Sequence, residues 1–203
     1  MSNEPYHFFL SIPAMEIIAG LIRKYPYITR HLKEISRWTE EPHVTILGFN
    51  SYVEPYVVKA AISEWLLSCR IAPICLTLDG YRGGSAGQTQ VLLFDKNDNK
   101  ELRKLREGIS KIVRYYVVHE GTFKKYLNHL CPIFHIAIGR TMSHANLDTL
   151  ASSVRGMLLE TGYLKLEIRR GTKILEKTPV YIGMKKGVRE EVLYRIVYST
   201  STT

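Results

Sequence analysis

Two short stretches place a histidine in the same setting, HVTILGF at 43–49 and HIAIGR at 135–140. Each stretch consists mostly of aliphatic residues and predicts a buried strand. Because side chains alternate between the two faces of a strand, His43 shares a face with Thr45, and His135 shares one with Ala137. Each histidine is therefore expected on the less apolar face of a hydrophobic strand.

Two imidazoles that converge on one cleft are sufficient for phosphodiester chemistry. A neutral ring can remove a proton from the attacking hydroxyl or water, while a protonated ring supplies one to the leaving oxygen. Free imidazole titrates near neutral pH, so a modest difference in environment can set these opposite states. Thr45 could donate a hydrogen bond to a non-bridging phosphate oxygen. We interpret His43, His135 and Thr45 as candidate catalytic residues.

The alternative is that both histidines are structural, since a lone histidine on a strand is more often a hydrogen-bonded core residue than a catalyst. Repetition favours the catalytic interpretation, because the two stretches lie 92 residues apart (135 − 43), nearly half the chain. A catalytic zinc usually takes three protein ligands, and neither stretch contains a carboxylate or cysteine. We therefore expect no metal site and no cofactor.

The surrounding sequence predicts alternating strands and helices without a low-complexity linker. The order in the first half, strand, helix, histidine-bearing strand, helix, returns in the second half. This repetition favours one α+β domain over residues 1–203, in which each of two lobes contributes one histidine-bearing strand. The expected elements are strands 6–12, 42–49, 74–78, 90–94, 132–139, 163–169, 179–184 and 192–198, and helices 14–37, 54–68, 98–118 and 143–161.

The composition is that of a soluble globular protein with a basic surface. The chain has 28 Lys and Arg against 19 Asp and Glu, a net charge of +9, which favours polyanions such as nucleic acid or nucleotides. A basic surface kept only for solubility is an equally weighted alternative. The three cysteines form no CxxC pair, the N-terminus is a poor signal peptide, and no apolar run is long enough to span a membrane. We expect a cytoplasmic monomer that does not enter a membrane.

The two stretches resemble a known pair of motifs. HVTILGF looks like the HxTLxF-type first motif of the 2H phosphoesterase superfamily, whose best-known branch is the 2′-5′ RNA ligase and 2′,3′-cyclic phosphodiesterase family, and HIAIGR resembles the second motif, HxTLAR. The resemblance implies a bilobal, pseudo-twofold α+β fold, with two antiparallel-sheet lobes and outer helices around a central cleft. It also implies metal-independent cleavage, or reversible formation, of 2′-linked phosphodiesters in RNA or small nucleotides.

The chain departs from this pattern at Ala137, where the second motif normally has a hydroxyl. One hydrogen bond to a charged group is worth about 1.5–3 kcal/mol, or roughly 10- to 100-fold in rate. Thr141 lies too far along the strand to replace the hydroxyl, and Tyr181 is one of several tyrosines that could. Arg140 matches the residue that helps to hold substrate in the family, but it needs a bulge near Gly139 to share the face of His135.

Two interpretations of the function therefore remain open. The leading one is a phosphodiesterase acting on 2′,3′-cyclic phosphates or 2′-5′ linkages. The alternative, motivated by Ala137 and the net charge of +9, is an RNA- or nucleotide-binding module with weak or degenerate activity. In both, the partner is RNA or a nucleotide with a 2′-linked phosphate.

Overall fold

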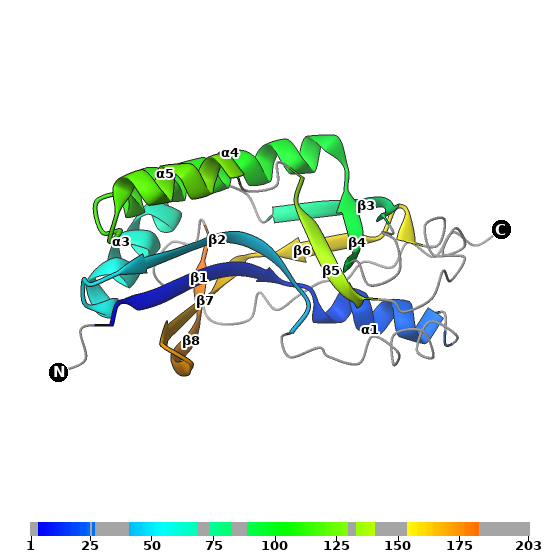
Figure 1. Cartoon of the computed structure of the whole chain (residues 1–203). Helices are drawn as coiled ribbons and strands as arrows, with labels where there is room; N and C mark the ends of the chain where they lie inside the picture. The colour runs from blue at the N-terminus through cyan, green and yellow to red at the C-terminus, as the bar shows by residue number, and fades with distance from the viewer. Residues whose placement is uncertain are drawn as a thin grey trace.

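The computed structural model of the chain describes residues 4–24, 26, 41–68, 74–82, 89–129, 133–140 and 154–182. Within these ranges, eight antiparallel strands form one curled sheet in the order β6-β3-β4-β5-β2-β1-β7-β8 (Figure 1). The predicted α+β class is therefore confirmed. The strands are β1 (Tyr6–Pro13), β2 (His43–Ser51), β3 (Ile74–Arg82), β4 (Thr89–Phe94), β5 (His135–Arg140), β6 (Leu158–Thr161), β7 (Tyr163–Arg170) and β8 (Lys173–Tyr181).

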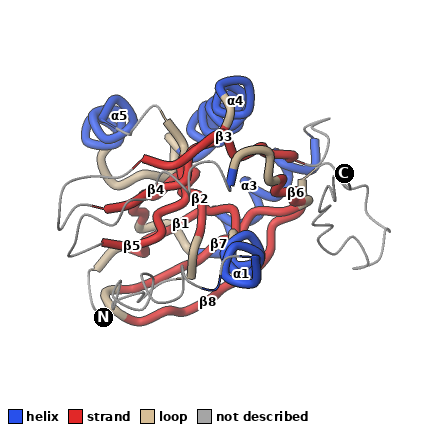
Figure 2. Tube along the Cα trace, turned by 90° about the vertical axis from the view of Figure 1, so that its right-hand side faces the viewer, coloured by secondary structure: helices blue, strands red, loops and turns tan. Residues whose placement is uncertain are grey.

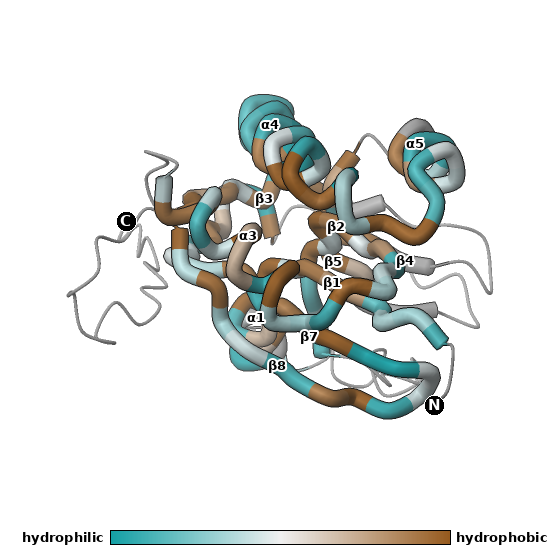
Figure 3. Tube along the Cα trace, turned by 90° about the vertical axis from the view of Figure 1, so that its left-hand side faces the viewer, coloured by the Kyte–Doolittle hydropathy of each residue, from teal (hydrophilic) through white to brown (hydrophobic). Residues whose placement is uncertain are grey.

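The helices are α1 (Met15–Lys24), α3 (Pro55–Ser68), α4 (Lys96–Val113) and α5 (Glu120–His129). In Figures 1 and 2, α4 and α5 lie on one side of the central strands, and α1 lies on the other. α4 packs on the sheet through a helical stripe of buried side chains, Leu102, Leu105, Ile109 and Val113. The side of α4 that is turned away from the sheet is mostly hydrophilic (Figure 3). No helix in the described ranges is long and apolar enough to cross a membrane.

The core lies on the face of β1 and β2 that is turned away from the histidines. Phe8, Leu10 and Ile12 of β1 are fully buried, as are Val44 and Ile46 of β2. His43 and Thr45, on the opposite face of β2, are only half-buried. The alternation predicted from the sequence therefore holds over the first half of this strand.

The two halves of the sheet are not the two halves of the chain. β2 and β5 meet at the centre of the sheet; β1, β7 and β8 flank β2, while β4, β3 and β6 flank β5. The half that contains His43 is thus completed by a hairpin more than a hundred residues later, in which Gly171 adopts the left-handed conformation (φ 56°) between β7 and β8.

Several predicted boundaries are wrong. The helix predicted over 143–161 overlaps β6, which pairs with β3 from Leu158 to Thr161; the earlier part of that prediction, and the strand at 192–198, lie outside the described residues. The predicted helix 98–118 overlaps α4 alone, which ends at Val113 and is followed by a turn at 114–116; α5 lies beyond the predicted range. The strand predicted at 179–184 overlaps only the end of β8, which begins at Lys173. α4 begins at Lys96, two residues before the predicted start, and is capped by Asp95, whose carboxylate accepts a hydrogen bond from the Asn97 N–H (2.7 Å).

Candidate active site

The two histidine-bearing strands lie side by side at the centre of the sheet. β2 and β5 run antiparallel, with Val44 opposite Ile136. Extending this register by one residue in each direction sets Thr45 opposite His135 and His43 opposite Ala137, all four on the same face. The two histidines are then diagonal neighbours across the strand pair, at a backbone separation of about 7–8 Å. That spacing leaves room for one phosphate group between the two rings.

Both imidazole rings are held by the same kind of contact. Nδ1 of His43 lies 2.6 Å from the carbonyl oxygen of Glu41, and Nδ1 of His135 lies 3.2 Å from that of Ile133. In each case the acceptor belongs to the residue two positions earlier. An Nδ1–H that donates to a carbonyl leaves Nε2 to accept or to donate a proton, so either ring can serve as base or as acid. The ring of Phe9 also packs edge-on against His43, at 5.2 Å between centroids.

Both strands contain a bulge three residues after the histidine. In the pairing of β1 with β2, Ser11 faces Thr45 while Leu10 faces Leu47, which leaves Ile46 as an extra residue. In the pairing of β4 with β5, Val91 faces Ala137 while Gln90 faces Gly139, which leaves Ile138 as an extra residue. The two predicted motifs thus match in contact and in strand geometry as well as in sequence.

The bulge at Ile138 bears on the assignment of Arg140. Strict alternation turns residue 140 away from His135, and one extra residue reverses that parity. The backbone of β5 therefore has the irregularity that the assignment of Arg140 to the substrate requires. The side chain of Arg140 is outside what the structure describes, and its role stays a prediction.

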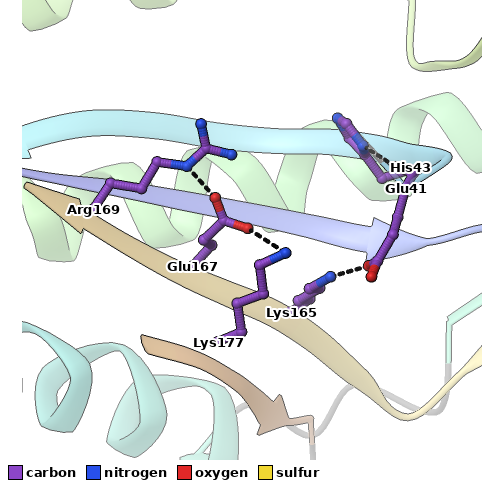
Figure 4. A network of polar contacts seen from close by, with 6 residues as sticks. All are labelled: Glu41, His43, Lys165, Glu167, Arg169 and Lys177. Carbon is purple, nitrogen blue, oxygen red and sulfur yellow. Dashed lines mark hydrogen bonds and ion pairs between the residues drawn. The ribbon is translucent and has the colours of Figure 1, made fainter. Parts of the chain in front are cut away.

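A network of charged residues lies beside His43 on the same face of the sheet (Figure 4). Lys165 of β7 pairs with the carboxylate of Glu41, and Arg169 of β7 pairs with Glu167. Glu167, whose side chain is only 8% exposed, also lies 3.3 Å from the ammonium of Lys177 on β8. Three cations thus share two carboxylates, which leaves a net positive charge next to the histidine.

The pKa values of both carboxylates are lowered by these cations. The hydrogen bond from Lys165 lowers the pKa of Glu41, against a smaller opposing effect of burial. For Glu167 burial on its own would raise the pKa, but Arg169 and Lys177 together outweigh it. Both groups are therefore charged near neutral pH, and the network keeps its ion pairs there.

Two side chains of α4 hold the histidine-bearing strands from behind. The Asn99 amide accepts a hydrogen bond from the backbone N–H of Phe134 (2.7 Å) and donates to the carbonyl of Phe94 (2.9 Å). Two turns later, Arg106 donates to the carbonyl of Ile46 from Nε (2.7 Å), and its guanidinium carbon lies 3.9 Å from the Phe134 ring centroid. The residue before His135 and the bulge after Thr45 are therefore fastened to the same helix.

This role of α4 is hard to predict from the sequence. In the sequence, Asn99 lies in the first turn of the predicted helix 98–118, and Arg106 looks like one of many surface cations on an amphipathic helix. The one sequence signal for this role is that Asn99 is a polar residue at a core-facing position of the helix. Arg106 gives no such signal, because its hydrogen bonds depend on a bulge in a distant strand.

Among the described residues that flank Ala137, no hydroxyl replaces the one that the second motif lacks. The residues that face Ala137 on the two neighbouring strands are Val91 and His43. Tyr181 is on β8, where it packs against Tyr163 of β7. Because β8 lies four strand positions from β5, Tyr181 is not a neighbour of Ala137. Within the part of the chain that the structure describes, no group of three or more His, Cys, Asp or Glu could hold a metal ion.

Comparison with solved structures shows that the fold is known. The chain resembles Escherichia coli LigT in complex with 3′-AMP, at 16% identity and a TM-score of 0.52, over 88% of this chain and 99% of that one. It also resembles TT0787 of Thermus thermophilus, at 14% identity and a TM-score of 0.51, over 86% of this chain and 97% of that one. A structure described as a phosphoesterase matches at 17% identity and a TM-score of 0.52, over 88% and 99% of the two chains.

Searches at the level of sequence return nothing. No family model matches the chain, and no curated protein matches it. The relationship is therefore visible in the arrangement of strands and helices and not in overall sequence similarity.

Proposed function

Because this chain has the fold of the 2H phosphoesterases, we propose that it is a metal-independent phosphodiesterase acting on 2′,3′-cyclic phosphates or 2′-5′ linkages of RNA or small nucleotides. His43 and His135 act as the general acid/base pair. Thr45 donates a hydrogen bond to a non-bridging phosphate oxygen, and Arg140 binds the substrate.

The observation that carries the proposal is the equivalence of the two histidines. They lie on adjacent strands, each has Nδ1 against the carbonyl oxygen two residues earlier, and each is followed by a bulge at the third residue. Two structural histidines have no reason to share all of these features. Acid/base catalysis at a phosphodiester does require two such groups, on the attacking and leaving sides of the phosphorus.

Displacement at the phosphorus follows from this placement. The Nε2 atom of one ring accepts a proton from the water molecule that attacks the phosphorus. The other ring donates its Nε2 proton to the departing ribose oxygen. The Thr45 hydroxyl stabilises charge on the non-bridging oxygens, where it increases in the transition state. The net positive charge of Lys165, Arg169 and Lys177 beside His43 attracts the anionic substrate.

The proposal is tested by incubating the protein with 2′,3′-cyclic nucleotides and 2′-5′-linked oligonucleotides in the presence of EDTA. Turnover of at least one substrate class is expected, since neither histidine needs a metal for proton transfer. If no substrate of either class is cleaved, the result would count against the proposed phosphodiesterase activity. Activity that disappears on chelation and returns with added metal would refute the metal-free mechanism.

A second candidate function, an RNA- or nucleotide-binding module with weak turnover, is favoured by one observation. Ala137 leaves the second half of the site without the hydroxyl that Thr45 provides in the first, and neither of the described residues facing it supplies one.

Substitution of Ala137 by threonine separates the two candidates. In an active but slowed enzyme, Ala137→Thr is expected to raise kcat about 10-fold or more, because it restores a hydrogen bond to the charged phosphate. Ala137→Val is the matched control, since valine has the same shape without the hydroxyl and suits a strand equally well. Steady-state hydrolysis of a 2′,3′-cyclic nucleotide measures both variants. Equal rates for Ala137→Thr and Ala137→Val would favour the binding module.

A further inference from the structure

A second cavity adjoins the surroundings of His43. The cavity at His43 itself has a volume of about 200 Å³, and its neighbour, which we call the tyrosine pocket, has a volume of about 470 Å³. The two share Pro13, Glu41, Lys165 and Lys177 as lining residues. A ligand at the histidine can therefore extend directly into the tyrosine pocket, whose size falls in the range of small-molecule sites.

The far wall of the tyrosine pocket is aromatic and apolar. Tyr163 and Tyr181 lie opposite each other on β7 and β8, with ring centroids 6.0 Å apart and planes inclined by 63°. Met15, 49% exposed, and Pro179 complete this wall. Burial, together with Tyr181 and the nearby carboxylates of Glu16 and Glu41, raises the pKa of Tyr163. Neutral phenol rings of this kind form stacking surfaces that accept any nucleobase.

The wall that the two cavities share contains two lysines and one carboxylate, Lys165, Lys177 and Glu41. Lys165 pairs with Glu41, and Lys177 pairs with Glu167 (Figure 4). Each ammonium group has three N–H donors, so one carboxylate partner does not use them all. These two lysines lie between the histidine and the tyrosines, where a phosphate would link a nucleotide at His43 to one in the tyrosine pocket.

We propose that the tyrosine pocket binds a second nucleotide of the substrate, with its base against Tyr163 and Tyr181 and its linking phosphate on Lys165 and Lys177. This inference rests on the proposed function, because the first nucleotide is the one at His43. It narrows the substrate class from nucleotides in general to RNA ends or oligonucleotides of at least two residues.

Binding measurements test the proposal without requiring turnover. The protein is titrated with a mononucleotide 3′-phosphate and with a dinucleotide 3′-phosphate, and the ratio of the two Kd values gives the preference for the dinucleotide. For the wild type we expect a preference of about 5- to 150-fold, the contribution of one stacked base. Tyr163→Leu/Tyr181→Leu is expected to remove most of it. Tyr56→Leu, at an exposed tyrosine of α3, is the control that retains it.

The phosphate contact has its own variant, which does not alter the aromatic wall. Lys177 has a side chain that is 40% exposed on the edge strand, so Lys177→Gln is expected to fold normally. It should weaken binding of the dinucleotide more than binding of the mononucleotide, and lower the slope of log Kd against log salt for the dinucleotide by about 0.7. An equal affinity of the wild type for both ligands, or a preference that persists in both variants, would overturn the proposal. Hydrolysis of a 2′,3′-cyclic mononucleotide by the same preparation reports separately on the proposed function.

Discussion

Replacing either His43 or His135 by alanine is expected to lower kcat for a 2′,3′-cyclic nucleotide by about 10²–10⁴-fold, the usual contribution of a positioned acid or base. The two histidines serve the same transition state from opposite sides, so the double variant should lose little more than the worse single variant. Steady-state hydrolysis of the purified variants measures the effect.

His119 provides the matched control for this experiment. It lies at the start of α5 with an exposed side chain, so His119→Ala should retain wild-type turnover. Near-normal turnover in His43→Ala or His135→Ala would remove that residue from the mechanism. The pH dependence of kcat/KM assigns a role to each histidine. If a variant loses the acidic limb of the profile, the replaced histidine is the base; if it loses the basic limb, the replaced histidine is the acid.

The second large effect is expected from Arg106, which contacts the bulge of β2 and the residue that precedes β5. Arg106→Met retains the length and the apolar stem of the side chain, while it removes the hydrogen bonds to the carbonyls of Thr45 and Ile46 and the stacking on Phe134. We expect the free energy of unfolding to fall by about 1–3 kcal/mol. We also expect kcat to fall by up to about 100-fold, the consequence of a misplacement of about 1 Å at the site, with little change in KM.

The split between kcat and KM distinguishes a positioning role from a structural one. Arg106→Lys retains the charge but loses the planar fork, so it should restore stability better than it restores kcat. Lys104→Met, which removes an exposed cation on the outer face of the same helix, is the control for general damage to α4. If Arg106→Met lowers only the unfolding free energy, with kcat per folded molecule unchanged, Arg106 supports the fold and not the site.

The sequence is sufficient to predict the strands that carry the histidines, because alternation over 43–46 and 134–137 leaves one face strongly apolar and puts the histidine on the other. It is insufficient for boundaries where apolar residues suit either structure. Leu158 and Leu159 fit a helical stripe as well as a strand, and only the pairing with β3 decides between them. The end of α4 escapes prediction because the aromatic and β-branched residues from Tyr115 to Val118 continue its apolar pattern.

The rest of the site depends on partners distant in sequence. A bulge is a property of two paired strands, so the extra residues Ile46 and Ile138 cannot be read from either strand alone. The same holds for Arg106, whose hydrogen bond to Ile46 spans 60 residues of the chain. The proximity of Lys165 to Glu41 follows from a strand order in which β7 pairs with β1, and no local pattern specifies that order.

That strand order has a consequence for biosynthesis. Tyr6 of β1 pairs with Arg170 of β7, 164 residues later in the chain (170 − 6). At about 5–20 residues per second, roughly 6–24 s pass between synthesis of His43 and synthesis of Lys165. During that interval β1 and β2 can pair with each other, but β1 presents an open edge that can pair with other strands. A ribosome that stalls within this window would display an aggregation-prone edge, and co-translational chaperones that cover strand edges should engage the chain until β7 emerges.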